Sequence, residues 1–252
     1  MGAERTRMMN YKMLIQYDGT RYDGWQKQGN TGNTIQGKLE DILQKMTGEY
    51  VEIHGSGRTD AGVHSIGQTA NFRLNKEMDG NEIYQYVNKY LPEDIAVIKI
   101  EQADQRFHAR LNAKGKTYRY RIGTSPATSV FEQRFIYHTG RTYHVAEMRR
   151  AAEFLLGTHD FKSFCSNKRM KKSTVRTIDK IDIVELDGEL RIDISGDGFL
   201  YHMVRILVGT LLEIGEDLRT AEEIPYILSG LNRELAGKTA PAKGLTLLEV
   251  RY

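Results

Sequence analysis

One stretch of the sequence, "GSGRTDAGVH" at residues 55–64, carries two charged side chains whose types and spacing could do chemistry. Arg58 and Asp60 are two residues apart, so both side chains can lie on the same side of a tight loop. The small residues Ala61 and Gly62 follow and leave space beside the carboxylate for a bulky ligand. A carboxylate in such a loop can act as a nucleophile or as a base, but an aspartate in a turn can also simply bond backbone amides. The stretch alone leaves both interpretations open.

Two further residues stand out from the pattern around them. Arg205 lies in an otherwise apolar run, "HMVRILVG", and an unpaired buried charge is costly. We therefore favour an ion pair for Arg205 over a surface arginine whose head group reaches water. Tyr118 alternates with Tyr120 in "GKTYRYRIG", which puts both on one face of a strand, so one or both can be ordinary core aromatics.

Several familiar chemistries lack their sequence patterns. No complete glycine-rich dinucleotide motif, phosphate-binding loop or serine nucleophile elbow occurs. The histidines show no metal-ligand spacing, so the sequence predicts neither a metal nor an organic cofactor. Cys165 is the only cysteine, which excludes an intramolecular disulfide and favours the reducing cytoplasm. No apolar run is long enough to predict a membrane span.

Positive charge is concentrated in two windows although the net charge is only +3. Residues 105–131 contain no acid and carry Arg106, Arg110, Lys114, Lys116, Arg119 and Arg121. Residues 161–178 also contain no acid and carry Lys162, Lys168, Arg169, Lys171, Lys172 and Arg176. Such windows favour a surface that faces a polyanion over two solvated loops with chance charge. Aromatic residues interleave with the first window, as base stacking requires, and Lys168 and Arg169 are candidate substrate-binding residues in the second.

The elements that must position these residues follow from periodicity. In the first half, alternation predicts strands over 11–17, 51–57, 67–74 and 94–102, and helical spacing predicts helices over 33–48 and 82–92, the first capped by Asn33 or Thr34. In the second half we expect strands over 114–123 and 245–252, a hairpin over 175–198 with an Asp187–Gly188 turn, and helices over 145–157, 199–215 and 220–230.

Both halves therefore have the order β-α-β-β-α-β, typical of a duplicated ferredoxin-like α+β fold. We expect one mixed, mostly antiparallel sheet with helices on one face and a basic cleft on the other. The predicted domains are 10–108, which carries the loop with Asp60, and 109–252. Residues 1–9 are expected to be disordered or foreign to the natural chain.

The Asp60 stretch closely resembles the signature of the tRNA pseudouridine synthase A (TruA) family. Five more segments resemble family blocks in the expected order, and together they span nearly the whole chain from Asn10: "YDGTRYDGWQKQ", "RFHARLNAKGKTYRYRI", "GTHDFKSF", "GDGFLYHMVRILVGTLLEIG" and "APAKGLTLLEVRY". The resemblance implies a cytoplasmic homodimer that binds tRNA. It also implies conversion of uridine to pseudouridine at positions 38, 39 and 40 of the anticodon stem-loop, without metal or organic cofactor.

The resemblance also implies a role for individual residues. Asp60 would be the catalytic carboxylate and Arg205 the cation that keeps it ionised away from water. Tyr118 would stack on the uracil ring and could take the C5 proton. Arg58 would fill the place that the target base vacates in the stem, and Leu245 would line the pocket, although it is equally compatible with plain core. Whether Asp60 attacks the sugar, attacks the ring or removes a ribose proton stays open.

Two alternatives stay open at this stage. The lysine-rich loop "FCSNKRMKKSTVRTI" is compatible with the same chemistry on ribosomal RNA. A non-catalytic RNA-binding module or folding chaperone on the same scaffold is the second, although the presence of Asp60, Tyr118 and Arg205 argues against it.

Overall fold

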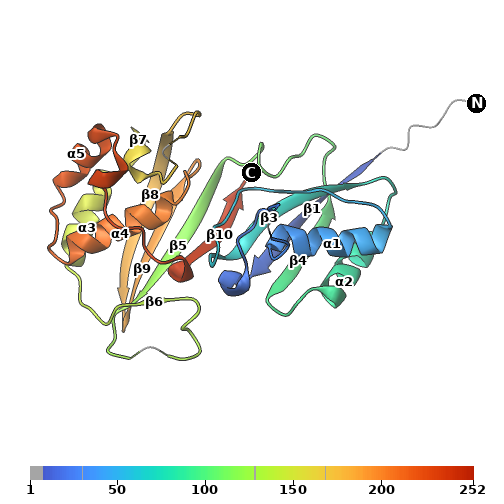
Figure 1. Ribbon diagram of the computed structural model, residues 1–252, viewed down its shortest axis with the longest axis horizontal. Helices are drawn as coiled ribbons and strands as arrows, with labels where there is room; N and C mark the ends of the chain where they lie inside the picture. Colours follow the sequence, from blue (N-terminus) through green and yellow to red (C-terminus); the bar gives the residue numbers. More distant parts are fainter. Residues whose placement is uncertain (1–7, 30, 128, 168) are drawn as a thin grey trace, which may run out of the picture. The chain divides into compact units, whose positions relative to one another are not determined.

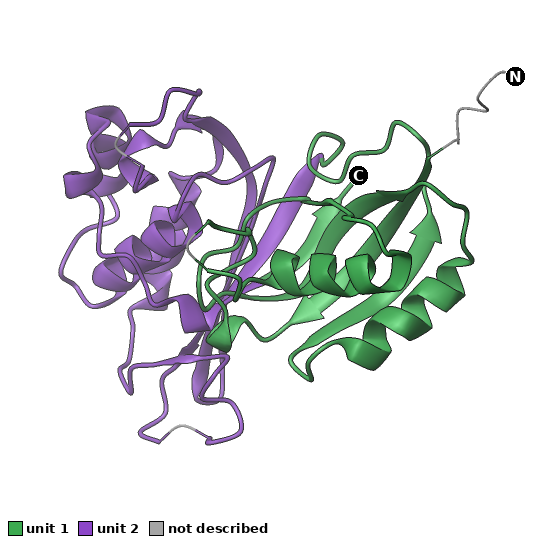
Figure 2. Ribbon diagram, turned by 45° about the vertical axis from the view of Figure 1, so that its right-hand side comes forward, with its two compact units in different colours: residues 1–113, 247–252 green, residues 114–246 purple. Residues whose placement is uncertain are grey.

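The structure is a computed structural model that describes residues 8–29, 31–127, 129–167 and 169–252. The chain forms two compact units (Figure 2). Unit 1 takes in the described residues up to Ala113 together with Leu247–Tyr252, and unit 2 is Lys114–Thr246. No helix in the described ranges is long and apolar enough to cross a membrane.

Unit 1 follows the predicted order of elements. Its bounds are β1 (Met9–Tyr17), α1 (Ile35–Thr47), β2 (Ile53–Gly55), β3 (His64–Leu74), α2 (Gly80–Tyr90) and β4 (Ile95–Gln102), with a short 3-10 turn at Gly19–Arg21. The strands lie in the order β4–β1–β3 and pair antiparallel. The other edge of β3 is shared, because β2 pairs with Ala70–Phe72 and β10 (Leu245–Arg251) is also a neighbour of β3 (Figure 1).

Local sequence accounts for the ends of α1. The Thr34 hydroxyl accepts a hydrogen bond from the Gly37 amide, which satisfies a free donor in the first turn. Of the two predicted caps, Thr34 is therefore the one used. The helix ends at Gly48, whose φ of 80° is the left-handed conformation that glycine adopts without strain.

Alternation along β1 separates the two faces of the unit 1 sheet. Tyr11, Met13 and Ile15 are fully buried on the face that packs with α1 and α2. Asn10 points to the opposite face, where its side-chain amide donates to the carbonyl groups of Asp104 and Phe107. The beginning of the first basic window is thus fastened to the sheet face opposite the helices.

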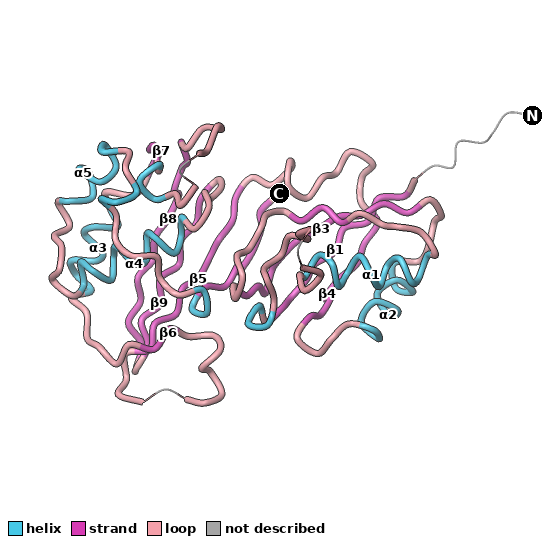
Figure 3. The backbone as a smooth tube through the Cα atoms, viewed as in Figure 1, coloured by secondary structure: helices cyan, strands magenta, loops and turns pink. Residues whose placement is uncertain are grey.

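Unit 2 contains the second set of elements. Its bounds are β5 (Gly115–Gly123), β6 (Tyr137–His138), α3 (Val145–Glu153), β7 (Gly157–Asp160), β8 (Val175–Leu186), β9 (Glu189–Gly196), α4 (Met203–Gly215) and α5 (Glu223–Gly230). Strands β5–β9–β8–β7 are antiparallel neighbours, and β6 runs parallel to β5. The α+β class and the mixed, mostly antiparallel pairing are therefore confirmed; Figure 3 shows how helices and strands are distributed.

The hairpin of β8 and β9 has the predicted turn. Leu186 pairs with Glu189 across Asp187 and Gly188, and Gly188 has a φ of 70°. A β-branched or bulky residue would be strained in this conformation, which explains the "DG" signal.

Two predicted helix boundaries in unit 2 are wrong by four residues each, and α5 begins at Glu223 instead of Thr220. Helix α3 ends at Glu153 instead of Gly157, because residues 157–160 pair with Val175–Ile178 as the short edge strand β7. Helix α4 begins at Met203 instead of Phe199, because His202 has a left-handed φ of 62° that cannot continue a helix. The apolar periodicity of both stretches extends past the points where the backbone leaves the helix.

Candidate active-site residues in the two units

The loop that carries Asp60 joins β2 to β3, and its first residues are hydrogen-bonded to Gln68 on β3. The Gln68 side chain donates to the carbonyl group of Gly57 at 3.0 Å and accepts a hydrogen bond from the Ser56 hydroxyl at 2.6 Å. The Ser56 amide also donates to the carbonyl group of Thr69. Ser56 and Gln68 are both fully buried, so the start of the loop is fixed by satisfied polar contacts.

Thr59, the residue before Asp60, is buried against strand β1 and the segment that follows it. Its hydroxyl lies 2.9 Å from the Tyr17 hydroxyl, and its carbonyl group accepts from the Trp25 amide at 3.1 Å. Burial raises the pKa of Tyr17 to about 12, so this phenol stays protonated near neutral pH. Thr59, next to the candidate carboxylate, is therefore held by hydrogen bonds to both its side chain and its main chain.

The backbone of Asp60 itself closes a tight turn. Its carbonyl group accepts from the Val63 amide at 3.1 Å, and Gly62 between them has a left-handed φ of 77°. The Asp60 residue is half-buried. Such a turn holds the carboxylate on a rigid support, as a catalytic group requires.

Arg58 lies on the same loop but is exposed. Its Nε donates to Oε1 of Gln26 at 3.3 Å. The sequence prediction that Arg58 and Asp60 belong to one loop is thus realised within unit 1, and the guanidinium has a defined neighbour.

Tyr118 and Tyr120 on β5 differ in their partners within unit 2. Tyr120 is fully buried, and its hydroxyl donates to the carbonyl group of Pro241 at 2.7 Å, which makes it a core aromatic. Tyr118 is 7% exposed, and its ring meets Phe199 edge-on at a centroid distance of 5.3 Å. Phe199 belongs to the "GDGFLYHMVR" segment that precedes α4.

Arg205 lies in the first turn of α4. Its Nε donates to the carbonyl group of Ala240 at 2.7 Å, and the Ala240 amide donates back to the carbonyl group of Arg205 at 3.0 Å. The side chain is thus half-buried and fastened to the segment before β10 within unit 2, and the ion pair favoured from the sequence stays a prediction. Leu245 is 5% exposed at the start of β10.

The second basic window is only partly represented. Lys168 lies outside the described residues. Arg169 is exposed, and its backbone amide donates to the Asn167 side chain.

The candidate residues divide between the two units. Unit 1 contains Arg58 and Asp60, and unit 2 contains Tyr118, Arg169, Arg205 and Leu245. That they act in one site stays a prediction.

Comparisons with known proteins identify the family. The model of the family described as tRNA pseudouridine synthase matches residues 13–112 and 151–252. The tRNA pseudouridine synthase A of Bacillus sp. (strain KSM-64) is 46% identical over 245 residues, 97% of this chain and all of the relative. Those of Acetivibrio thermocellus and, as tRNA pseudouridine synthase A 2, of Bacillus anthracis are 45% and 43% identical with the same coverage. The chain belongs to the tRNA pseudouridine synthase family.

The solved structures add less. A Cbf5–Nop10–Gar1 complex aligns over 94% of this synthase and 48% of that chain, with 12% identity and a TM-score of 0.40. A likeness this weak carries no argument about the fold or the site, so the family assignment depends on the sequence matches.

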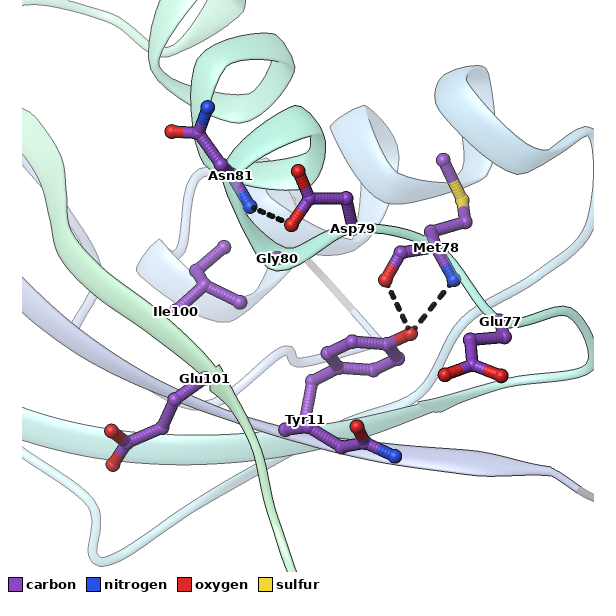
Figure 4. Close-up of a pocket in the computed structure, with 9 residues that line it drawn as sticks. Tyr11, Glu77, Met78, Asp79, Gly80, Asn81, Ile100 and Glu101 are labelled. Carbon is purple, nitrogen blue, oxygen red and sulfur yellow. Dashed lines mark hydrogen bonds between the residues drawn. The ribbon is translucent and has the colours of Figure 1, made fainter.

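One open pocket of about 550 Å³ lies within unit 1 of the synthase, at the start of α2 (Figure 4). Its wall contains the carboxylates of Glu77, Asp79 and Glu101. The Tyr11 hydroxyl in this wall is already bonded to the backbone of Met78. The pocket contains no predicted site residue, and its acidic lining has the wrong sign for a polyanion.

Sequence reasoning missed a buried polar group behind Arg58. Gln36 and Glu40 of α1 are 6% and 1% exposed, and they connect to Gln26 through hydrogen bonds. Their i, i+4 spacing beside Leu39 and Leu43 was a usable signal, because polar residues next to an apolar helix stripe can be buried only with partners.

Proposed function

We propose that this chain isomerises uridine to pseudouridine in tRNA, at positions 38, 39 and 40 of the anticodon stem-loop. The observation that carries the proposal is the Arg58–Asp60 loop, which has the family signature and is fixed at Gly57, Thr59 and Val63. Nearly full-length identity to tRNA pseudouridine synthases A supports the substrate class.

The chemistry requires a carboxylate on a rigid support. Uracil must leave its ribose, turn, and reattach through C5, and a carboxylate can start this sequence as a nucleophile or as a base. We assign this role to Asp60. The anchored backbone on either side of Asp60 limits the reorganisation needed when the uridine arrives.

Arg205, Tyr118 and Leu245 take supporting roles in this proposal. An arginine near the carboxylate would keep Asp60 ionised in a pocket that excludes water. Tyr118 would stack on uracil, and its edge-on contact with Phe199 supports a fixed ring orientation. Leu245 would add an apolar wall, which its burial allows.

Arg58 would take part in extruding the target base. A nucleotide in a stem must leave the stack, which costs a few kcal/mol. A planar guanidinium can occupy the vacated place and bond phosphate as well. The exposure of Arg58 leaves it accessible to a nucleic acid. We further propose that Lys168 and Arg169 contact the tRNA, and that the chain acts as a homodimer in the cytoplasm.

The decisive experiment compares binding with product formation. Asp60→Asn should bind a tRNA transcript with wild-type affinity and form no pseudouridine, measured by tritium release from labelled uridine. Turnover within tenfold of wild type would remove Asp60 from the mechanism. If the wild-type protein binds the transcript but releases no tritium, the chain is an RNA-binding module and not a synthase. Pseudouridine mapping of total RNA from a deletion strain would show whether tRNA or ribosomal RNA is the target.

A further inference from the structure

Glu40 is a buried acidic residue that the proposed mechanism does not use. It lies on α1 with 1% of its surface exposed. Burying a carboxylate is costly unless it is paired and hydrogen-bonded. The hydrogen bonds around Glu40 therefore show how unit 1 offsets that cost, and which neighbouring side chains the carboxylate orients.

The Glu40 carboxylate is surrounded by donors. Oε1 accepts from the Gln36 side chain at 2.8 Å and from the Ile53 amide at 3.2 Å. Oε2 accepts from the Lys27 ammonium at 3.2 Å and from the Tyr50 hydroxyl at 3.3 Å. Donors therefore occupy both oxygens of the carboxylate, and one of these donors is the Lys27 ammonium. The hydrogen bond from Lys27 to Glu40 in turn raises the pKa of Lys27.

The Glu40 carboxylate accepts hydrogen bonds on both oxygens, and this fixes which way the Gln36 amide points. Gln36 Nε2 donates to Glu40 and to the carbonyl group of Ile53 at 3.1 Å. A flipped amide would place its oxygen against two acceptors, which is unfavourable. Gln36 Oε1 must therefore face the other way, where it accepts from the Lys27 amide at 3.0 Å and from the Gln26 side chain at 2.7 Å.

The same logic fixes Gln26. Because Gln36 presents an oxygen, Gln26 must direct its Nε2 toward that oxygen. This leaves Gln26 Oε1 directed to the Arg58 Nε, 3.3 Å away. The buried carboxylate thus fixes the orientation of the Gln36 amide, which fixes that of the Gln26 amide, and Gln26 presents an acceptor to the exposed Arg58 guanidinium.

We infer that Glu40, Gln36 and Gln26 are positioning residues that hold the Arg58 guanidinium ready before RNA binds. The inference rests on the proposed role of Arg58 in extruding the target base. A pre-oriented guanidinium loses less conformational freedom when it enters the vacated place in the stem. Gln26 shapes this step without touching the reacting atoms.

The test is a double-mutant cycle in single-turnover kinetics. Gln26→Leu keeps the side-chain size and removes the acceptor for Arg58. We expect it to slow pseudouridine formation about fivefold, the usual effect of one such hydrogen bond, with the dissociation constant for tRNA changed less than twofold. In an Arg58→Ala background, Gln26→Leu should have no further effect. An equal slowing in both backgrounds would overturn the inference, because Gln26 would then act independently of Arg58.

An NMR measurement tests the positioning without activity. The Nε–H resonance of Arg58, identified by its loss in Arg58→Lys, should exchange with water faster in Gln26→Leu than in wild type. Glu40→Gln, if circular dichroism shows it folded, should give the same change because a carboxamide no longer fixes the polarity of Gln36. An unchanged resonance in Gln26→Leu overturns the inference.

The matched control is Gln44→Leu, the same substitution at an exposed position of α1 outside the network. It should leave the rates and the Arg58 resonance at wild-type values. If Arg58→Ala turns over as fast as wild type, the proposed role of Arg58 fails, and the NMR comparison still decides whether the network positions this side chain.

Discussion

The Tyr17 hydroxyl lies 2.9 Å from the hydroxyl of Thr59, so a core residue of β1 supports the residue beside Asp60. Tyr17 is 5% exposed and also lies 3.5 Å from the Gln68 side chain, which supports the start of the same loop. The position of the candidate carboxylate is thus tied directly to the core of unit 1.

We expect Tyr17→Phe to weaken this support. Thr59 loses a buried hydrogen-bond partner, which should lower the free energy of unfolding by about 1 kcal/mol. Single-turnover pseudouridine formation should fall severalfold because the loop is held less firmly. Urea denaturation measures the free energy of unfolding, and product formation measures the rate. A loss of stability without any change in rate would show that this hydrogen bond does not help to position the loop.

Tyr17 also predicts an alkaline effect on stability. Its pKa is raised to about 12 by burial, so the folded state holds the phenolic proton more tightly than the unfolded state, where the value is 10.0. This contribution is present below pH 10 and is lost as pH rises through about 12. The advantage of wild type over Tyr17→Phe in the free energy of unfolding should therefore fall over this range and then change sign, because a shift from 10.0 to about 12 outweighs the hydrogen bond. An advantage that stays constant would contradict the shift.

Gly24→Ala should disturb the loop from its other side. Gly24 has a φ of 92°, and a Cβ there would lie 2.6 Å from the carbonyl oxygen of Thr59. Strain and overlap should together cost about 2 kcal/mol of stability and displace Thr59. Gly29→Ala is the control, because a Cβ at that position meets nothing within 4 Å. Equal midpoints of the two variants in thermal denaturation would contradict both the strain and the overlap at Gly24.

On the acid side, Glu189 predicts a pH dependence in unit 2. Burial alone would raise its pKa, but hydrogen bonds from Arg121 and Arg191 outweigh that effect and lower the pKa to about 2. The stabilisation is therefore present above the ordinary value of 4.5 and is lost as pH falls toward 2.

Glu189→Gln should accordingly destabilise the protein near neutral pH and lose this disadvantage in acid. Glu132→Gln removes a half-exposed partner of the same Arg121 and should have a smaller effect. Acid titrations of the free energy of unfolding measure both variants, and parallel curves for wild type and Glu189→Gln would show that this carboxyl is not linked to folding.

The basic windows predict a salt dependence of tRNA binding. Arg106 and Arg110 are exposed in the first window, and Lys171 and Lys172 are exposed in the second. Removing either pair should weaken binding and lower the slope of log affinity against log salt by about 1.5, because two phosphate contacts are lost. Lys45→Gln on α1 is the control. A slope that stays at the wild-type value would place the polyanion surface elsewhere.

The sequence predicted correctly those features of the structure that depend on neighbouring residues. The Thr34 cap and Gly48 end of α1 and the Asp187–Gly188 turn depend on contacts within a few residues. The loop that presents Asp60 was predicted for the same reason, since glycines and a change of period mark its ends.

Tertiary structure decided the features that depend on distant partners. Helix α3 ends early because β8 offers an open edge to residues 157–160, and nothing in the helical pattern carries that information. Residues Leu247–Tyr252 join unit 1, where the Tyr252 hydroxyl donates to the carbonyl group of Ala109. The position of Glu40 beside an apolar helix stripe indicates burial but not which groups contact its carboxylate. Only the fold brings Lys27, Gln36, Tyr50 and Ile53 around its carboxylate, because the stability of a buried charge depends on groups that the chain delivers from elsewhere.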